Sequence, residues 1–297
     1  MNSEIYHYCI IGNLISWIEN NLENELNSEI ISNKSGYSIN YLQRKFKKIT
    51  GYSISEYVRR RRIFRATLYL CLTGKRISAI SKCLGYRSSS VFIHLFKKNF
   101  LTTPLVYRRN KVLDLFNALP RIELMKERPN IEIDRHIEHE EITLYGKIYT
   151  YTIAVTDFDK PHYPIRKVFR ESFFTDTGFN SDNYCTAAWY SPSYDDQHID
   201  VSYFIGTDDI SMMNSCPEHC KYITMQFKNA KSFRCTDHII NPYDIIIDVI
   251  FRILKEYNEG WTTEWDFERF GLTDNNRVTL EYIIPVRYLN KQVKNEH

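Results

Sequence analysis

Acidic residues are absent from the whole stretch between Glu56 and Asp114. Residues 1–110 carry 18 Lys and Arg against 6 Asp and Glu, whereas the rest of the chain carries 21 against 30. The whole chain is nearly balanced, at net +3, so its two parts differ strongly in charge. A basic half is expected of a protein that binds a polyanion, although a solvated basic face would have the same composition.

The sequence also lacks the features of several other protein classes. The most apolar stretch, residues 245–251, is short and interrupted by Asp248, and residues 1–8 do not have the pattern of a signal peptide, so we expect no membrane association. Seven scattered cysteines favour free thiols in the cytoplasm over a disulfide framework. The glycines of a nucleophile elbow or phosphate loop and paired carboxylates are missing, so we expect no catalytic residues and no cofactor.

One short segment could bind a metal ion by its residue types. Residues 216–220 read Cys-Pro-Glu-His-Cys, but these side chains are crowded and no second pair of ligands follows elsewhere. We therefore expect a loop with free thiols here and no metal site.

A turn followed by a helix occurs twice in the basic half, about fifty residues apart. The copies begin at Gly36 and Gly85, and from the following serine onward they keep register. The matched positions are Ser38/Ser88, Leu42/Phe92, Phe46/Phe96, Lys47/Lys97, Lys48/Lys98 and Tyr57/Tyr107. Internal repetition fixes the architecture of a chain. Two helices with one apolar and one basic face favour a protein that reads two neighbouring turns of a DNA groove.

Helical periodicity and capping residues predict seven helices in the first 110 residues. They cover residues 9–23, 28–34, 38–50, 53–72, 77–83 and 88–99, with a last helix after Pro104. Ser38 is placed to cap the third helix, and Ser53 with Glu56 resembles a capping box for the fourth. The long fourth helix would join two three-helix units.

Beyond a proline-containing boundary the pattern changes to that of strands. The expected strands cover residues 142–153, 184–190, 199–205, 222–227, 232–235 and 278–285, and the expected helices cover 164–174 and 243–257. The second half therefore predicts an α+β domain with helices on a mostly antiparallel sheet. The predicted domains are residues 1–112 and 130–290, with a linker at 113–129 and a tail at 291–297.

The helix that begins at Ser38 has the composition of a DNA-reading helix. Leu42 and Phe46 should face the core. The residues expected to face DNA are Asn40, Tyr41, Gln43, Arg44, Lys47 and Lys48. Glutamine can bond bidentately to adenine and arginine to guanine, whereas the lysines suit phosphates. The alternative is an exposed polar face with no partner.

The second such helix offers weaker base discrimination. Its outward positions are Ser89, Ser90, Ile93, His94, Lys97 and Lys98. Either this helix lies mainly along the DNA backbone, or it reads groove shape and thymine methyl groups. The arginine run at residues 59–62 is expected to mix packing, phosphate contact and solvent exposure.

Three segments carry a resemblance to the AraC/XylS family of transcription activators. They are Gly85-Tyr86, Phe92-Ile93-His94-Leu95-Phe96-Lys97 and Thr103-Pro104-Leu105-Val106-Tyr107-Arg108. Leu42-Gln43-Arg44 before Phe46 is similar to the MarA/SoxS/Rob branch. The resemblance implies an all-α double helix-turn-helix domain that binds an asymmetric double-stranded DNA promoter site as a monomer and contacts RNA polymerase.

The chain departs from this branch at several positions. Asn40 stands where the branch has tryptophan, and Leu101 stands where it has glycine. Ser89, Ser90 and His94 replace a Gln-Gln pair and an arginine. These departures leave the branch's DNA-binding fold in place but put its particular target sequence in question.

Residues 130–290 resemble the GyrI-like effector domain, most clearly at Leu280-Glu281-Tyr282-Ile283-Ile284-Pro285-Val286. The resemblance implies that Glu281 pairs with a small apolar or cationic ligand in an aromatic pocket. Candidate walls are Tyr149, Tyr151, Trp189, Tyr203, Trp261, Trp265 and Phe270. Without the resemblance, Glu281 would be taken as an exposed charge. Two alternatives stay open: an interaction module without a ligand, and a hydrolase-like domain acting on small electrophiles.

Overall fold

The structure is a computed structural model, and it describes residues 3–114, 118–124, 129–160, 162–179, 181–212, 220–237, 245–246, 249–273, 275 and 277–289. The chain forms two compact units. The first comprises Met1–Leu70, Lys75–Asn110 and Asp114–Glu127, and the second comprises Cys71–Gly74, Lys111–Leu113 and Arg128–His297. Each unit is described by itself, and the domain limits expected from the sequence stay a prediction.

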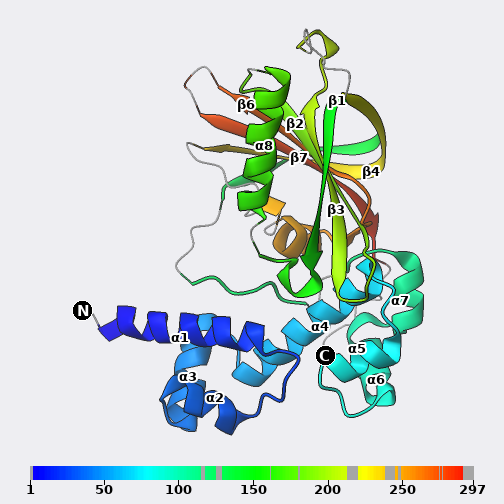
Figure 1. The fold of residues 1–297 in the computed structure, drawn as a ribbon. Coiled ribbons are helices and arrows are strands. Elements are labelled where there is room, and N and C mark those ends of the chain that lie inside the picture. Colours follow the sequence, from blue (N-terminus) through cyan, green and yellow to red (C-terminus); the bar gives the residue numbers. More distant parts are fainter. Residues whose placement is uncertain are drawn as a thin grey trace. The chain divides into compact units, whose positions relative to one another are not determined.

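Helices form the described part of the chain up to residue 110, as the sequence predicts (Figure 1). They are α1 (Ser3–Asn20), α2 (Ser28–Ser35), α3 (Ile39–Thr50), α4 (Ile54–Leu72), α5 (Ile77–Cys83), α6 (Ser89–Phe100) and α7 (Pro104–Asn110). The predicted stripe on α1 is buried, and it packs with residues of α2, α3 and α4 in one apolar core. The amphipathic pattern therefore identified both the helix and the face that packs.

The helix ends follow the predicted capping residues with two exceptions. Ser88 Oγ accepts a hydrogen bond from the Val91 N–H at 3.2 Å, but Ser38 caps α3 without a side-chain bond. Ser53 Oγ accepts from the Glu56 N–H at 3.2 Å, whereas the Glu56 carboxylate pairs with Arg60 rather than closing the capping box. The backbone geometry at each helix start is correct even where the predicted side-chain bond is not formed.

The repeat seen in the sequence is also a repeat of packing. Phe46 and Tyr57 meet edge to face with ring centroids 5.7 Å apart, and the matched pair Phe96 and Tyr107 does the same at 5.2 Å. All four side chains are buried. Both copies of the repeat, α3 and α6, are therefore held at their base by the same aromatic contact.

The second unit contains a seven-stranded antiparallel sheet. Its strands are β1 (Ile131–Ala154), β2 (Tyr184–Pro192), β3 (His198–Thr207), β4 (Lys221–Asp237), β5 (Glu259–Trp261), β6 (Asp266–Leu272) and β7 (Val278–Tyr288). They lie in the order β4-β1-β3-β2-β6-β7-β5, and a further pairing of β4 with β7 closes six of them into a ring. The predicted antiparallel α+β domain is confirmed.

Several strand predictions were wrong in extent. Residues 222–227 and 232–235 belong to one strand, β1 begins eleven residues before the expected start at 142, and β5 and β6 were not expected. β6 reads Asp-Phe-Glu-Arg-Phe, so it places charged residues at buried positions and hides the usual alternation. Charges buried by tertiary contacts cannot be recognised from a local pattern.

The sheet has two different faces. One face carries an apolar cluster that includes Leu144, Phe204, Phe227, Phe267 and Ile283. The other face packs against α8 (Tyr163–Thr177), which crosses the strands in Figure 1. Later in the chain, between β4 and β5, lie a π-helical turn, Val249–Ile253, and the short α10 (Leu254–Glu256). This second face holds the polar groups that matter for the site.

Candidate nucleic-acid interface and buried carboxylate cluster

The expected groove-facing side of α3 is open to solvent along most of its length. Asn40, Arg44, Lys47 and Lys48 are exposed, and Gln43 is half-buried. On the opposite side of this helix the predicted core residues Leu42 and Phe46 are buried. The helix can therefore present an amide, a guanidinium and two ammonium groups to a nucleic acid without disturbing its packing.

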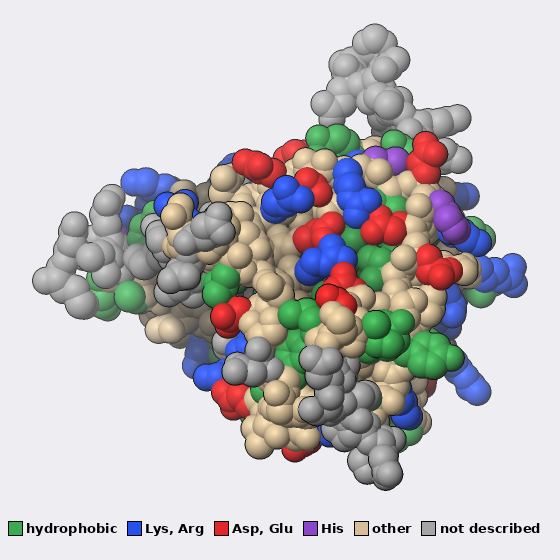
Figure 2. Space-filling view, turned by 90° about the horizontal axis from the view of Figure 1, so that it is seen from above, with side chains coloured by type: hydrophobic (Ala, Val, Ile, Leu, Met, Phe, Trp, Pro, Cys, Tyr) green, Lys and Arg blue, Asp and Glu red, His purple; other side chains and the backbone are tan. Residues whose placement is uncertain are grey.

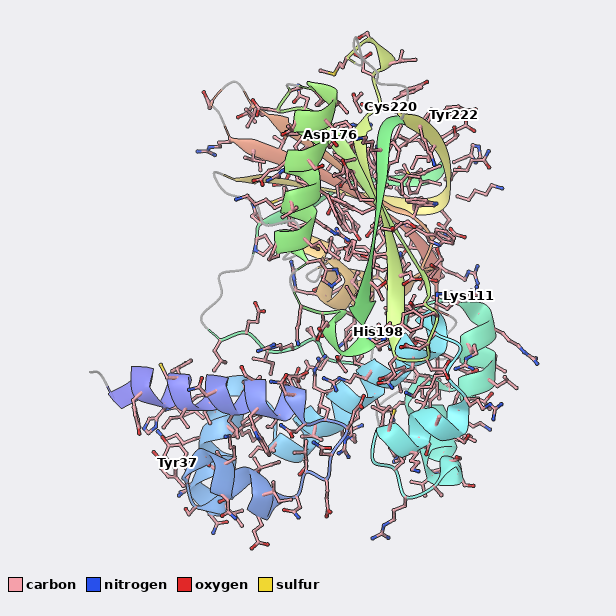
Figure 3. All side chains as sticks on the ribbon, in the orientation of Figure 1. Tyr37, Lys111, Asp176, His198, Cys220 and Tyr222 are labelled. Carbon is pink, nitrogen blue, oxygen red and sulfur yellow. The ribbon has the colours of Figure 1, made fainter. Side chains whose placement is uncertain are left out.

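Tyr41 differs from its neighbours because it is engaged within the protein. Its ring lies 4.9 Å from that of Tyr37, and its hydroxyl is 3.3 Å from His7 Nε2. His7 Nδ1 in turn lies 2.8 Å from the hydroxyl of Tyr37, which is labelled in Figure 3. The Lys45 ammonium sits 5.5 Å from the centre of the Tyr41 ring. Tyr41 therefore fixes the side of α3 against α1 more than it reaches outward.

The matching side of α6 is also open, but its chemistry is different. Ser90, Ile93, His94, Lys97 and Lys98 are exposed, and Ser89 is half-buried. Phe92 and Phe96 lie buried beneath them. Apart from the paired lysines, this face has short hydroxyls, an imidazole and an aliphatic side chain where α3 has an amide and a guanidinium.

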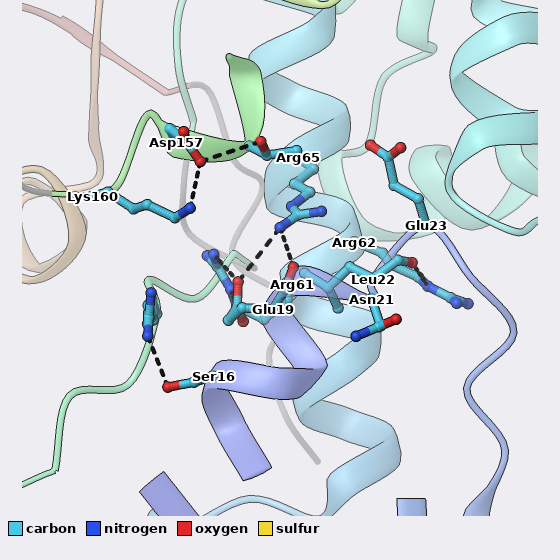
Figure 4. A network of polar contacts seen from close by, with 12 residues as sticks. Ser16, Glu19, Asn21, Leu22, Glu23, Arg61, Arg62, Arg65, Asp157 and Lys160 are labelled. Atoms are coloured by element: carbon cyan, nitrogen blue, oxygen red, sulfur yellow. Dashed lines mark hydrogen bonds and ion pairs between the residues drawn. The ribbon is translucent and has the colours of Figure 1, made fainter. Parts of the chain in front are cut away.

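The arginines of α4 are largely structural. Arg61 is fully buried, and its guanidinium holds Glu19 of α1 through two bonds of 2.8 and 2.7 Å (Figure 4). Arg62 donates to the carbonyls of Leu22 and Asn24, at 2.9 and 2.7 Å. These two arginines serve packing, as one part of the predicted mixture, and the N–H groups that bond within the protein are not available to phosphates.

Glu19 is the centre of this network. It is buried, and besides Arg61 it accepts a 2.7 Å bond from the Tyr57 hydroxyl, while its carbonyl accepts one from Arg65. Burial raises the pKa of this carboxyl, but the charge and hydrogen bonds of Arg61 outweigh burial and leave the pKa below its ordinary value. The carboxylate is therefore ionised and ties α1 to α4.

In the second unit, Phe270 lines a cavity together with Glu281, but most of the other residues expected to wall a pocket lie elsewhere. Tyr149 and Tyr203 are paired neighbours on β1 and β3, on the face covered by α8. Trp261 is buried against Tyr190, with ring centroids 5.4 Å apart. Trp189 is 43% exposed and lies beside Trp265 on the other face of β2. The predicted aromatic residues thus fall into separate groups.

Glu281 itself is already matched by cations of its own chain. Its carboxylate pairs with Arg269 and lies 3.5 Å from Arg135, and it accepts a 3.0 Å bond from Ser232 Oγ. It lines a cavity of about 650 Å³ together with Asp208 and other residues at the strand ends. Figure 2 shows basic and acidic side chains lying side by side on the face viewed there. An acid paired in this way has little charge left to attract a cationic ligand.

A second acidic group lies beneath α8, and the sequence did not indicate it. Glu268 of β6 is 3% exposed; one oxygen accepts a 2.5 Å bond from Thr186, and the other has no hydrogen-bond partner among the described residues. Asp266 on the same face accepts from the Ala188 N–H at 3.1 Å and the Tyr282 hydroxyl at 3.2 Å. Both carboxylates lie in the interior, among tyrosines.

Arg166 of α8 is the cation that faces these acids. Its guanidinium lies 4.6 Å from the centre of the Tyr203 ring and donates to the hydroxyls of Tyr151 and Tyr190, at 3.0 and 3.2 Å. Burial raises the pKa of Asp266 to about 7, with Arg166 opposing the shift and Glu268 adding to it. One arginine therefore balances two carboxylates only while Asp266 is protonated.

His162 completes this group without adding charge. Its Nε2 lies 3.2 Å from the Asp157 carbonyl and its Nδ1 lies 3.4 Å from the Tyr151 hydroxyl. Burial, assisted by the charge of Arg166, lowers the pKa of His162 to about 4. The neutral ring therefore donates through Nε2 and accepts through Nδ1, and His162 adds no positive charge to the cluster at neutral pH.

Comparison with known proteins identifies the family to which the helical unit with α3 and α6 is similar. Residues 31–110 match the family described as "Helix-turn-helix domain". The chain is 40% identical to the Tn10 transposon TetD protein of Escherichia coli over 110 residues, which are 37% of this chain and 80% of TetD. It is 40% identical to the regulatory protein SoxS of Salmonella typhimurium over 102 residues, 34% of this chain and 95% of SoxS. The chain belongs to the AraC/XylS family of DNA-binding transcription regulators.

A third AraC/XylS relative extends further along the chain. The transcriptional regulator Rob of Salmonella typhimurium is 30% identical over 164 residues, which are 55% of this chain and 56% of Rob. The chain thus spans little more than half the length of Rob. The resemblance of the second unit to the GyrI-like domain stays a prediction, as does the role of its residues.

In the described part of this AraC/XylS protein, neither a metal-ligand cluster nor a membrane-spanning helix is found. Among the described residues, no group of three or more His, Cys, Asp and Glu side chains is arranged to hold a metal ion. Residues 216–219 of the cysteine-containing segment lie outside that part, and Cys220, labelled in Figure 3, is half-buried. No described helix combines the length and apolar character needed to cross a membrane.

Proposed function

We propose that this AraC/XylS-family chain reads an asymmetric double-stranded promoter site as a monomer, with α3 and α6 in successive major grooves. The observation that carries the proposal is the repeat in sequence and in packing, which gives two basic-faced helices at the two ends of α4. The 19 residues of α4 span about 28 Å. This length is close to the pitch of about 34 Å that separates successive major-groove faces of a duplex.

The two helices differ in how well they can recognise bases. Gln43 and Arg44 of α3 carry the groups that pair bidentately with adenine and guanine. The paired lysines of both helices, at 47, 48, 97 and 98, suit phosphates and give affinity without sequence information. RNA polymerase as the partner in activation is an expectation drawn from the family.

Selection of bound sequences from random duplexes tests this proposal, with the full chain at near-physiological salt. We expect one enriched motif with two boxes one helical turn apart. The double variant Gln43→Ala/Arg44→Ala should lose sequence preference in one box only, because each helix reads its own box. Salt-sensitive binding with no enriched motif would contradict the proposal and indicate a non-specific basic surface.

We also propose that the second unit senses a small apolar cation, with Glu268 rather than Glu281 as the acid. Three facts support this choice: the oxygen of Glu268 that has no hydrogen-bond partner among the described residues, its tyrosine surroundings, and Asp266, which leaves two carboxylates to Arg166 once it ionises above about pH 7. A buried, incompletely balanced carboxylate attracts a cation more strongly than one already paired with two arginines. Because Glu268 is buried, a ligand reaches it only after side chains of α8 move.

Calorimetric titration with tetraphenylphosphonium tests the ligand proposal. We expect Glu268→Gln to weaken binding at least tenfold, since one charge pair in a dry site contributes about 1.4 kcal/mol or more. The matched control Glu281→Gln should bind as the wild type does. Equal binding by Glu268→Gln would place the ligand elsewhere. No binding to the wild type would favour an interaction module, and turnover of a small electrophile would favour the hydrolase alternative.

A further inference from the structure

The face of α6 that corresponds to the base-reading face of α3 has an exposed isoleucine at its centre. The sequence repeat aligns Ile93 with Gln43, and the Ile93 side chain is 37% exposed. Ser89 and Ser90 lie one turn before it and Lys97 lies one turn after it, so these side chains share one side of the helix. An aliphatic group therefore occupies the position that α3 gives to an amide.

Its neighbours make this side chain the prominent apolar group on its own side of α6. The two serines are short, so Ile93 reaches beyond them, and Lys97 carries a charge that suits a flanking phosphate. A helix packed along the DNA backbone would instead favour polar or basic residues at this position. Burying this aliphatic side chain in a complex is favourable only where an apolar group lies against it.

We propose that Ile93 contacts thymine 5-methyl groups in the major groove and makes the second box specific for thymine at that step. This inference rests on the proposed function, because it requires α6 to enter the groove. In the major groove, thymine presents a methyl group beside its O4 acceptor, whereas cytosine presents an amino donor and no methyl group. Removing one methyl-sized group from water changes affinity about fourfold.

The same helix supplies a matched control. Val91 is also β-branched and is 42% exposed. Positions two apart on a helix do not face the same way, so Val91 does not share the stripe of Ser89, Ile93 and Lys97. A general effect of exposed aliphatic side chains would appear at both positions, but a thymine contact should appear only at Ile93.

The test replaces thymine by deoxyuridine, which removes the methyl group and keeps the base pairing. The full chain and its variants Ile93→Ala and Val91→Ala are titrated with duplexes carrying the selected motif, with thymines or with deoxyuridines in the second box. We expect the replacement to weaken wild type and Val91→Ala about fourfold for each contacted methyl. Ile93→Ala should bind the two duplexes with nearly equal affinity.

The outcomes separate this inference from the function on which it rests. A selected second box without thymine, or an equal deoxyuridine effect in wild type and Ile93→Ala, would overturn the thymine contact while the two-box reader stands. Deoxyuridine in the first box should affect wild type and Ile93→Ala alike, which confirms that the change is local. Failure of the wild type to enrich any motif would overturn the proposed function and the inference with it.

Discussion

Replacing Glu19 by alanine is expected to destabilise the first helical unit by about 3–5 kcal/mol, because it leaves a buried cation without its partner. Arg61 is fully buried and would lose both of its bonds to the carboxylate. The Tyr57 hydroxyl would lose its acceptor at the same time. Urea titration of the full chain, followed by far-ultraviolet circular dichroism, measures the loss as an earlier helical transition.

A matched control and the pH dependence sharpen this prediction. Glu25 is exposed, and Glu25→Ala should stay within about 0.5 kcal/mol of wild type. The pKa of Glu19 is lowered in the folded protein, so its stabilisation is present above the ordinary glutamate pKa and is lost as the pH falls through the lowered value. If Glu19→Ala is as stable as Glu25→Ala, the buried pair does not hold α1 to α4.

The architecture of the DNA-binding half could be predicted because its signals are local. Glycine turns, capping serines and apolar residues three and four apart lie within a few residues of the structure they determine. The roles of the α4 arginines could not be separated in this way. Arg61 and Arg62 are adjacent in sequence and equally charged, yet their partners are Glu19 and the carbonyl of Leu22, about forty residues away. Such pairs become visible only when α1 and α4 are packed together.

The second unit shows the same limit at its candidate ligand site. Strand periodicity over residues 278–285 separates Glu281 and Tyr282 onto opposite faces, but it could not show that Arg269 and Arg135 neutralise that acid. The sequence did not indicate Glu268 as a site residue, because the buried charges of β6 interrupt the alternation by which a strand is recognised. Its surroundings come from β2, β3 and α8, so no sequence window contains them.

Separating the two selected boxes by an extra half turn of DNA is expected to reduce affinity about 100-fold or more. The structure places both recognition helices in one compact unit, with α4 joining their two halves. Five extra base pairs rotate the second box to the opposite side of the duplex, because one turn contains about 10.5 base pairs. The base contacts of one helix are then lost, and each lost base-pair step costs about 1–3 kcal/mol.

The decisive measurement is the dissociation constant of the full chain, at one fixed salt concentration, for three duplexes. One carries the selected motif, one has five base pairs inserted between the boxes, and one has the same five inserted outside them. A single monomer that reads two grooves predicts a loss of about 100-fold for the internal insertion alone. Unchanged affinity for all three duplexes would contradict the bipartite reader and would assign the binding to one helix or to a non-specific basic surface.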